Sequence, residues 1–456
     1  MVLQGVFQRF AEQAPFPVMA RLVLDRVFKS AKLDEWFERV TQRQYTRELL
    51  FSSVFEVMSL VAFKAFPTVH AAYQKRRDEV GVSVTSLYNK LNAMETRTAG
   101  ALVRDTAVEL AQAIEGLKGA RLPWLPGYRV KVLDGNCIEA SEHRLKVLRD
   151  TPAGPLPGKS LVVYDPSLEM AVDVFPCEDG HAQERSLLGD VVSTVQPGDI
   201  WIADRNFCVR GFLEGIKARE GHFVFRLHKG LSVTPLGSER RVGSTETGTV
   251  YEQWVEMGAT EGAKASRCRL IRIHLKHPTR DGDKDLFILT DLSKSSAHAK
   301  LVGQMYQRRW TIETMFQQLE AHLHSEVNTL GYPKAALLAF CIALVAYNAL
   351  AVVKAALRRV HGENTIAETV SGYYVALELT GNYQGMMIAL PPRSWSRFRN
   401  ASHREFLDLL ISIASGVDLT RYRKHSRGPK KPRPNRTKHA DKPHVSTARL
   451  LWERGR

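Results

Sequence analysis

Residues 199–228, DIWIADRNFCVRGFLEGIKAREGHFVFRLH, decide the fold class of this chain. Apolar residues alternate in DIWIAD and in HFVFRLH, which is typical of strands, whereas GFLEGIKARE between them has helical spacing. A strand, a helix and a strand in direct succession indicate a mixed α/β domain with a central sheet.

The same pattern extends upstream. YRVKVLD, SLVVYDP and MAVDVFP are predicted strands, and HAQERSLLGDVVSTV is a predicted helix. The turn-forming LPWLPG at 122–127 separates them from a region in which the apolar spacing is helical. We therefore predict an α-helical N-terminal domain over 1–122 and the first part of the sheet domain over 123–229.

A helix-turn-helix is one interpretation of VGVSVTSLYNKLNAM in the N-terminal domain. A glycine turn and a candidate N-cap, Ser83, precede apolar residues at helical spacing. An ordinary helical hairpin fits the pattern equally well. On the first interpretation, the DNA contacts expected here are Lys75, Arg76, Arg77 and Lys90.

Past residue 229 the pattern changes twice. Residues 230–290 are turn-rich with short strand-like runs, which predicts an all-β insertion. Helical spacing returns over 291–360, assigned to the remainder of the sheet domain, and continues in a C-terminal helical region at 361–420. Residues 421–456 are predicted to be a basic, disordered tail that binds polyanions.

Residues 335–353, AALLAFCIALVAYNALAVV, carry no charge and are long enough to span a membrane. The run stands alone, is rich in alanine and contains Asn348, so we favour a buried central helix over a membrane span. A net charge of +16 makes a polyanion, and nucleic acid before membrane, the expected partner.

The five cysteines include no CxxC pair, so neither a disulfide framework nor a zinc site is indicated. This usage fits a reducing cytoplasm. At the N-terminus, charges interrupt every apolar run, and we predict no secretory signal.

Two acids follow the apolar faces of predicted strands. Val130, Val132 and Asp134 share one face of YRVKVLD, and Ile200, Ile202 and Asp204 share one face of DIWIAD. An acid in such a place needs a cation, a hydrogen-bonding partner or a metal. Taken alone, each is more readily explained as a structural residue, Asp134 as the cap of a turn and Asp204 as an acid near Arg205.

A third acid lies on the predicted helix YQRRWTIETMFQQLE at 306–320. Tyr306, Arg309, Glu313 and Glu320 fall on one stripe at helical spacing, either as a solvated stripe with an i,i+4 ion pair or as part of a site. Three acids from separate elements can surround Mg²⁺, which prefers oxygen ligands, and two such ions support in-line displacement at phosphorus.

With these residues the chain resembles the DDE transposases of the insertion-sequence-four family, bacterial enzymes with an RNase H-like catalytic domain. Their signature is Tyr, two residues, Arg, three residues, Glu, six residues, Lys, and Tyr306, Arg309 and Glu313 match it. VLDGN, WIADRNF and FVFRLHK resemble the family's other blocks, so the resemblance covers roughly residues 125–350. Glu320 replaces the family's Lys, and the residues considered as substitutes are His322, His324 and Arg308.

The resemblance implies an RNase H-like mixed-sheet catalytic domain that carries the all-β insertion. It implies that Asp134, Asp204 and Glu313 are the catalytic residues and bind two Mg²⁺ ions, for which Mn²⁺ can substitute. It also implies DNA contacts, which we assign to Tyr306, Arg309, Trp310, Arg205, Arg226 and Lys229. For Trp310, base stacking and plain core packing remain alternatives.

The function expected from the resemblance is a metal-dependent DNA transposase. Such an enzyme binds the terminal inverted repeats of its insertion sequence, cleaves the ends and joins the 3′-hydroxyls to target DNA, as a homodimer in the bacterial cytoplasm at the nucleoid. The alternatives are a catalytically impaired, transposase-derived DNA-binding protein or regulator, and a membrane-associated protein built on 335–353.

Overall fold

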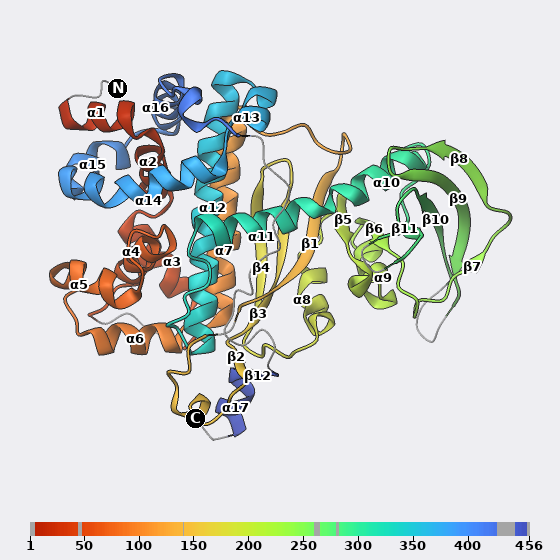
Figure 1. Ribbon diagram of the computed structural model, residues 1–456, viewed down its shortest axis with the longest axis horizontal. Coiled ribbons are helices and arrows are strands. Elements are labelled where there is room, and N and C mark those ends of the chain that lie inside the picture. The colour runs from red at the N-terminus through yellow and green to blue at the C-terminus, as the bar shows by residue number, and fades with distance from the viewer. Residues whose placement is uncertain are drawn as a thin grey trace.

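Figure 1 shows the fold as a computed structural model, which describes residues 5–43, 48–139, 141–259, 265–279, 282–425 and 443–453. Helices fill the left of the view, a sheet crosses the middle, and a β-rich lobe lies at the right. The chain is thus a mixed α/β protein with a large mixed sheet and many helices.

All the described strands except two short ones join in a single large sheet. The strands are β1 (Arg129–Cys137), β2 (Gly154–Leu156), β3 (Lys159–Asp165), β4 (Met170–Cys177), β5 (Asp199–Ala203), β6 (His222–Arg226), β7 (Thr234–Pro235), β8 (Arg240–Ser244), β9 (Gly248–Met257), β10 (Ser266–Leu275), β11 (Asp285–Thr290) and β12 (His444–Ser446). The large sheet has the order β4-β3-β1-β5-β6-β11-β10-β9-β7, and β8 also pairs with β9.

Strand direction changes on the two sides of β1. Strand β3 pairs antiparallel with both β4 and β1, whereas β1, β5 and β6 are parallel. From β6 outward, β11, β10 and β9 pair antiparallel again. The segment 230–290 therefore extends the sheet sideways through β7 to β11, and it forms the lobe at the right of Figure 1.

Helices surround this sheet. They are α1 (Gly5–Gln13), α2 (Pro15–Val27), α3 (Ser30–Val40), α4 (Phe51–Ala62), α5 (Val69–Val80), α6 (Val84–Ala93), α7 (Thr96–Gly116), α8 (Leu188–Ser193), α9 (Arg210–Ala218), α10 (Ala299–Gln307), α11 (Thr311–His322), α12 (Pro333–His361), α13 (Glu363–Thr369), α14 (Gly372–Ala389), α15 (Pro392–Arg399), α16 (His403–Ser415) and α17 (Thr447–Glu453). The 3₁₀ turns are η1 (Lys146–Leu148), η2 (Glu184–Leu187), η3 (Arg205–Phe207), η4 (Arg308–Trp310) and η5 (Leu419–Tyr422).

The alternation predicted for β1 and β5 separates two hydrophobic clusters. Val132 and Ile202 are fully buried in the cluster that contains α7, α10 and α12. Trp201 and Ala203, on the opposite face, belong to a cluster with α8 and α9. Asp134 lies two residues beyond Val132, so its side chain projects toward the face covered by α10 and α11.

Helix α12 contains the apolar run and contacts α2, α4, α6, α7, α16 and β4. It is long and apolar enough to span a membrane, but 94% of its most apolar window is buried inside the protein. Asn348, at its middle, donates to the carbonyl of Ala171 and accepts from the amide of the same residue, at 2.7 and 2.9 Å. This burial supports the central-helix interpretation.

Three predicted boundaries were wrong. Strand β1 continues through Asp134 to Cys137, because β3 pairs with it along that length. The predicted helix at 306–320 is broken by η4, which separates α10 from α11. The helix predicted for HAQERSLLGDVVSTV starts as a 3₁₀ turn, η2, and becomes α-helical only in α8.

The predicted disordered tail was wrong at both its ends. Residues 421–425 pack against the helical region, where the amide of Lys424 donates to the carbonyl of Thr369 at 2.7 Å. Residues 444–446 form β12, which pairs in parallel with β2, and α17 follows. Strand β2 is the pairing partner that the sequence did not reveal. Residues 426–442, most of the basic run, lie outside the described residues.

Candidate active site

Asp134 lies in β1, next to the parallel strand β5 at the centre of the sheet. Its side chain is 21% exposed, and its Oδ1 accepts the amide of Gly135 at 3.0 Å. Burial raises the pKa of Asp134 to about 6, although the positive charge of Arg309 opposes the shift. The groups around Asp134 therefore offset only part of the cost of burying its negative charge.

Asp204 is the first residue after β5. It is held by Tyr306 at the end of α10, whose hydroxyl donates to Asp204 Oδ1 at 3.1 Å. The tyrosine ring is 5% exposed, and burial together with the negative charge of Asp204 raises the pKa of the hydroxyl above its usual value. Tyr306 thus remains a neutral donor that orients the second acid.

Arg309 joins the other two acids. Its Nη1 donates to Asp134 Oδ2 at 2.8 Å, and its Nη2 donates to Glu313 Oε1 at 3.1 Å. Its side chain is 8% exposed, so the guanidinium is largely desolvated, whereas the Glu313 side chain is 31% exposed. Tyr306 and Arg309 therefore reach different acids, although Tyr306 lies at the end of α10 and Arg309 in η4 directly after it.

The three predicted acids therefore line one site, with Arg309 between two of them. Burial also raises the pKa of Glu313, against the charge of Arg309. Three carboxylates are the hard oxygen donors that Mg²⁺ prefers, so their chemistry fits such an ion. Among the described residues, however, no three His, Cys, Asp or Glu side chains are spaced to hold a metal as they stand. The Arg309 guanidinium instead lies between Asp134 and Glu313 and pairs with both.

Of the other predicted DNA contacts, two are exposed to solvent and two form ion pairs within the protein. Trp310 is 61% exposed, which excludes the core-packing alternative, and the Arg309 guanidinium lies 5.5 Å from its ring centroid. Lys229 is also exposed. Arg226 and Arg205 pair instead with Asp283, at 2.5 and 4.0 Å.

Glu320 lies in the last turn of α11. The Lys64 ammonium donates to the carbonyls of Glu320 and Ala321 at 3.1 and 2.9 Å, so a lysine from the N-terminal helices binds this end of α11. Arg308, one of the substitutes considered, points elsewhere, toward the ring of Trp124. Sequence reasoning did not anticipate Lys64, because it comes from a distant part of the chain.

The turn between α5 and α6 has the predicted form. Gly81 has φ +70°, and Ser83 Oγ accepts the amide of Ser86 at 3.1 Å as the N-cap of α6. Of the basic residues assigned to DNA there, Lys75 and Arg77 are exposed. Arg76 pairs with Glu56 and Glu79, and Lys90 donates to the carbonyl of Leu49 at 3.0 Å.

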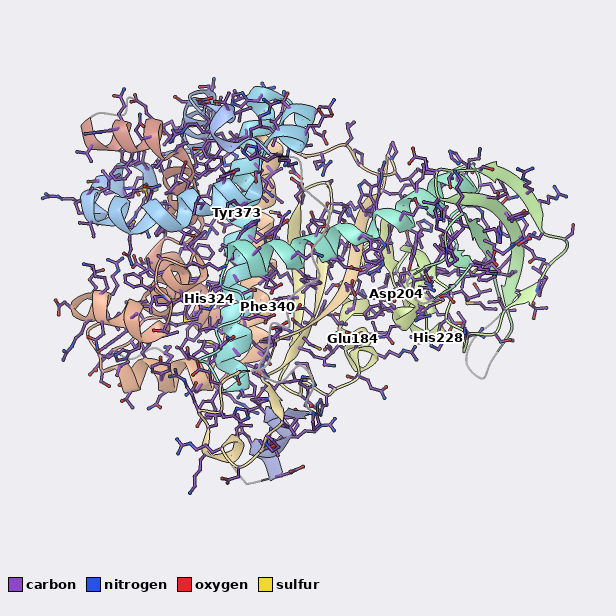
Figure 2. All side chains as sticks on the ribbon, viewed as in Figure 1. Glu184, Asp204, His228, His324, Phe340 and Tyr373 are labelled. Carbon is purple, nitrogen blue, oxygen red and sulfur yellow. The ribbon has the colours of Figure 1, made fainter. Side chains whose placement is uncertain are left out.

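One acidic side chain at the site was not predicted. Glu184, in η2, lies against Gly135 and accepts Asn206 Nδ2 at 2.6 Å. Figure 2 labels Glu184 and Asp204 close together beside α8 and β5. The only signal in the sequence was the glycine after Asp134, which is an unusual residue inside a strand.

Comparison with known proteins finds similarity over the region that contains these residues. Residues 127–349, which include Asp134, Asp204 and Glu313, match the family model for the transposase DDE domain. The "Probable transposase for insertion sequence element IS5377" of Geobacillus stearothermophilus is 22% identical over 201 residues, covering 43% of this chain and 48% of that protein. The "Putative transposase y4zB" of Sinorhizobium fredii (strain NBRC 101917 / NGR234) is 26% identical over 205 residues, covering 44% and 54%.

The chain thus spans about half the length of the curated relatives it matches. Among solved structures, the cryo-EM structure of the piggyBac transposase synaptic complex with hairpin DNA is similar at 11% identity and a TM-score of 0.39, over 89% of this chain and 86% of that one. The family match and the two relatives together support a DDE transposase, and the matched region contains the candidate site.

Proposed function

We propose that this protein is a DNA transposase of the insertion-sequence-four type that cleaves the inverted-repeat ends of its element and transfers the freed 3′-hydroxyls to target DNA. The observation that carries the proposal is the Arg309 bridge. It draws Asp134 and Glu313 together while Tyr306 holds Asp204, inside the region that matches the transposase DDE domain.

The strand order supports an RNase H-like catalytic domain. Strand β3 pairs antiparallel with β4 and β1, and β5 and β6 continue in parallel with β1. Asp134, in β1, and Asp204, directly after β5, therefore lie on neighbouring parallel strands. Neighbouring parallel strands bring their carboxyl ends to the same edge of a sheet, which is a common place for a catalytic site.

Asp134, Asp204 and Glu313 are the residues that would hold two Mg²⁺ ions, or Mn²⁺ in their place. The ions would supply an activated hydroxyl nucleophile and would stabilise the leaving oxygen at phosphorus. Arg309 competes with them for Asp134 and Glu313, and its release toward a DNA phosphate would leave both carboxylates without a partner.

The remaining residues of the site would bind DNA. Trp310 offers an exposed ring for stacking, and Tyr306 orients Asp204 rather than contacting DNA in this state. The net charge of +16 adds affinity that falls with salt. We place the enzyme in the bacterial cytoplasm, and we propose a homodimer on DNA, because two transposon ends must be joined.

Cleavage of candidate ends tests this function. The full chain is incubated with duplex DNA carrying an inverted repeat from the DNA that flanks its gene, with and without Mg²⁺. We expect nicking that requires Mg²⁺ and that falls by about 10²-fold or more in Asp134→Asn, Asp204→Asn and Glu313→Gln. Asp190→Asn, an exposed acid on α8, is the matched control.

The same assay separates the second candidate. The second candidate is a transposase-derived DNA-binding regulator without catalytic activity, and the observation that favours it is Glu320, which stands where the insertion-sequence-four signature has Lys. Binding of the repeats without nicking in any divalent metal would favour that regulator. Nicking that the three variants do not reduce would remove these acids from catalysis.

A further inference from the structure

Glu184 reaches the candidate site through a space that only glycine leaves open. A Cβ at Gly135 would overlap Glu184 Oε1. Gly135 lies in β1 and is not among the glycines with positive φ, so its backbone conformation does not require glycine. What Gly135 provides is room for a carboxylate beside Asp134.

The segment that follows Asp204 holds the Glu184 carboxylate in place. Asn206, two residues after Asp204, donates its Nδ2 to Glu184 Oε2 at 2.6 Å, and Arg185 Nε donates to the carbonyl of Asn206 at 2.7 Å. Glu184 is therefore fixed between the strand of Asp134 and the turn that follows Asp204.

The charge of Glu184 lacks a cation. Among the described residues, no Lys, Arg or His lies within 4.0 Å of its carboxylate. Burial is the main reason that the pKa of Asp134 is raised, and the negative charges of Glu313 and Glu184 add to it. A half-buried acid that faces other acids, with an amide as its recorded donor, is costly unless a further positive charge joins it.

We propose that Glu184 is a fourth carboxylate of this site, which binds a divalent metal ion together with Asp134. The inference rests on the proposed function and adds a ligand that the three-acid signature does not contain. Glu184 supplies one more hard oxygen, and Asn206 orients that oxygen as the partner of a ligating carboxylate.

The test uses the full chain without DNA and measures Mn²⁺ binding from the electron paramagnetic resonance signal of the free ion. Glu184→Gln removes the charge and keeps an acceptor for Asn206. Gly135→Ala keeps every carboxylate but forces the Glu184 carboxylate away from its position beside Asp134, because the added Cβ would overlap its Oε1. Both variants are expected to bind Mn²⁺ about tenfold or more weakly. Asp190→Asn, in the same segment, is expected to bind as the wild type does.

The outcomes separate this inference from the function on which it rests. Weakened binding in Gly135→Ala supports the proposal independently of folding changes in Glu184→Gln, because no charge is lost. Wild-type affinity in both variants, with binding lost in Asp134→Asn, overturns the role of Glu184 alone. Wild-type affinity in all three, Asp134→Asn included, overturns the metal site itself.

Discussion

Two buried arginines in this protein have opposite surroundings. Arg269, in β10 of the β-rich lobe, is fully buried, and its Nε donates to Glu252 at 2.8 Å while Nη1 donates to the carbonyls of Leu292 and Ala297 at 2.8 Å each. Arg309 is buried almost as deeply, but its hydrogen bonds go to two carboxylates, Asp134 and Glu313.

The carboxylates paired with these arginines respond differently. Burial opposes ionisation of Glu252, but hydrogen bonds from Lys294 and Arg269 hold its pKa below the usual value. The pKa of Asp134 is instead raised to about 6 despite Arg309. Arg269 is thus held by backbone carbonyls, whose positions the fold fixes. Arg309 instead neutralises the charge of carboxylates, and another cation could neutralise that charge as well. We interpret the first arginine as structural and the second as exchangeable.

The largest effect is expected for Arg269→Ala. It would leave several carbonyls and part of the Glu252 charge buried without a donor, and should lower the free energy of unfolding by about 3–5 kcal/mol. Urea denaturation measures this, and Mg²⁺ should not restore it. Arg267→Ala, on the same strand but packed over the ring of Trp254, is the control and should cost much less. Equal losses in the two variants would contradict a structural role specific to Arg269.

The pKa of Glu326 shows the effect of burial on an acid that has no arginine beside it. Burial and the negative charge of Glu139 raise its pKa from 4.5 to about 7. A raised acid pKa stabilises the fold fully below the unfolded pKa, and this stability is lost as the pH rises through about 7. The loss is at most about 3 kcal/mol at 1.36 kcal/mol per unit.

Glu326→Gln should therefore melt at a higher temperature than the wild type at pH 8, with a difference that shrinks toward pH 5. Thermal unfolding across this range measures it. Glu142→Gln, which removes an exposed acid paired with Arg144, should show no such dependence on pH. A difference that stayed constant with pH would mean that Glu326 is ionised throughout.

Arg309→Ala should sharpen the contrast with Arg269. Loss of the bridge leaves Asp134 and Glu313 without their cation and should cost about 1–3 kcal/mol in the absence of metal. Mn²⁺ should restore this stability and should bind more tightly than to the wild type, whereas end cleavage is lost. Melting temperatures with and without Mn²⁺ measure the effect, with Arg308→Ala as the exposed control. A smaller Mn²⁺ shift than in the wild type would contradict competition between metal and Arg309.

Tyr306→Phe should have the smallest effect on stability, about 1 kcal/mol, because it removes one hydrogen bond to Asp204. Its effect on end cleavage should be larger, about tenfold, since Asp204 loses the donor that orients it. Tyr128→Phe removes a hydroxyl bonded to Ser296 at 3.2 Å and is the matched control. If both variants cleave equally well, Tyr306 does not position Asp204.

Much of the fold followed from periodicity. Alternation in β1 and β5 placed Asp134 and Asp204 on one face, and local spacing marked the Tyr306, Arg309 and Glu313 set. The break at η4 was not predictable, because the sequence RRW contains neither glycine nor proline. The partners of the side chains around it were not predictable either, because Arg309 bonds to Asp134 and Tyr306 to Asp204, which lie far away in the sequence.

The other features that were not predicted from the sequence depend on contacts between distant segments. Glu184 is one of many acids in the sequence, and only its approach to Gly135 distinguishes it. Lys64 reaches the end of α11 across more than half of the chain, and β12 needs β2 as a partner. In each case the deciding partner is remote in sequence, so local patterns carry no trace of it.

Helix α12 has a consequence for how the protein can be divided. It contacts α2, α4, α6 and α7 before the sheet domain, α16 after it, and β4 within it. The sequence suggests an N-terminal module, a catalytic module and a C-terminal module, yet all three share this one helix as their interior. A fragment cut to the sheet domain alone would expose α12 to water and should aggregate, so the N-terminal helices cannot be removed as a detachable module.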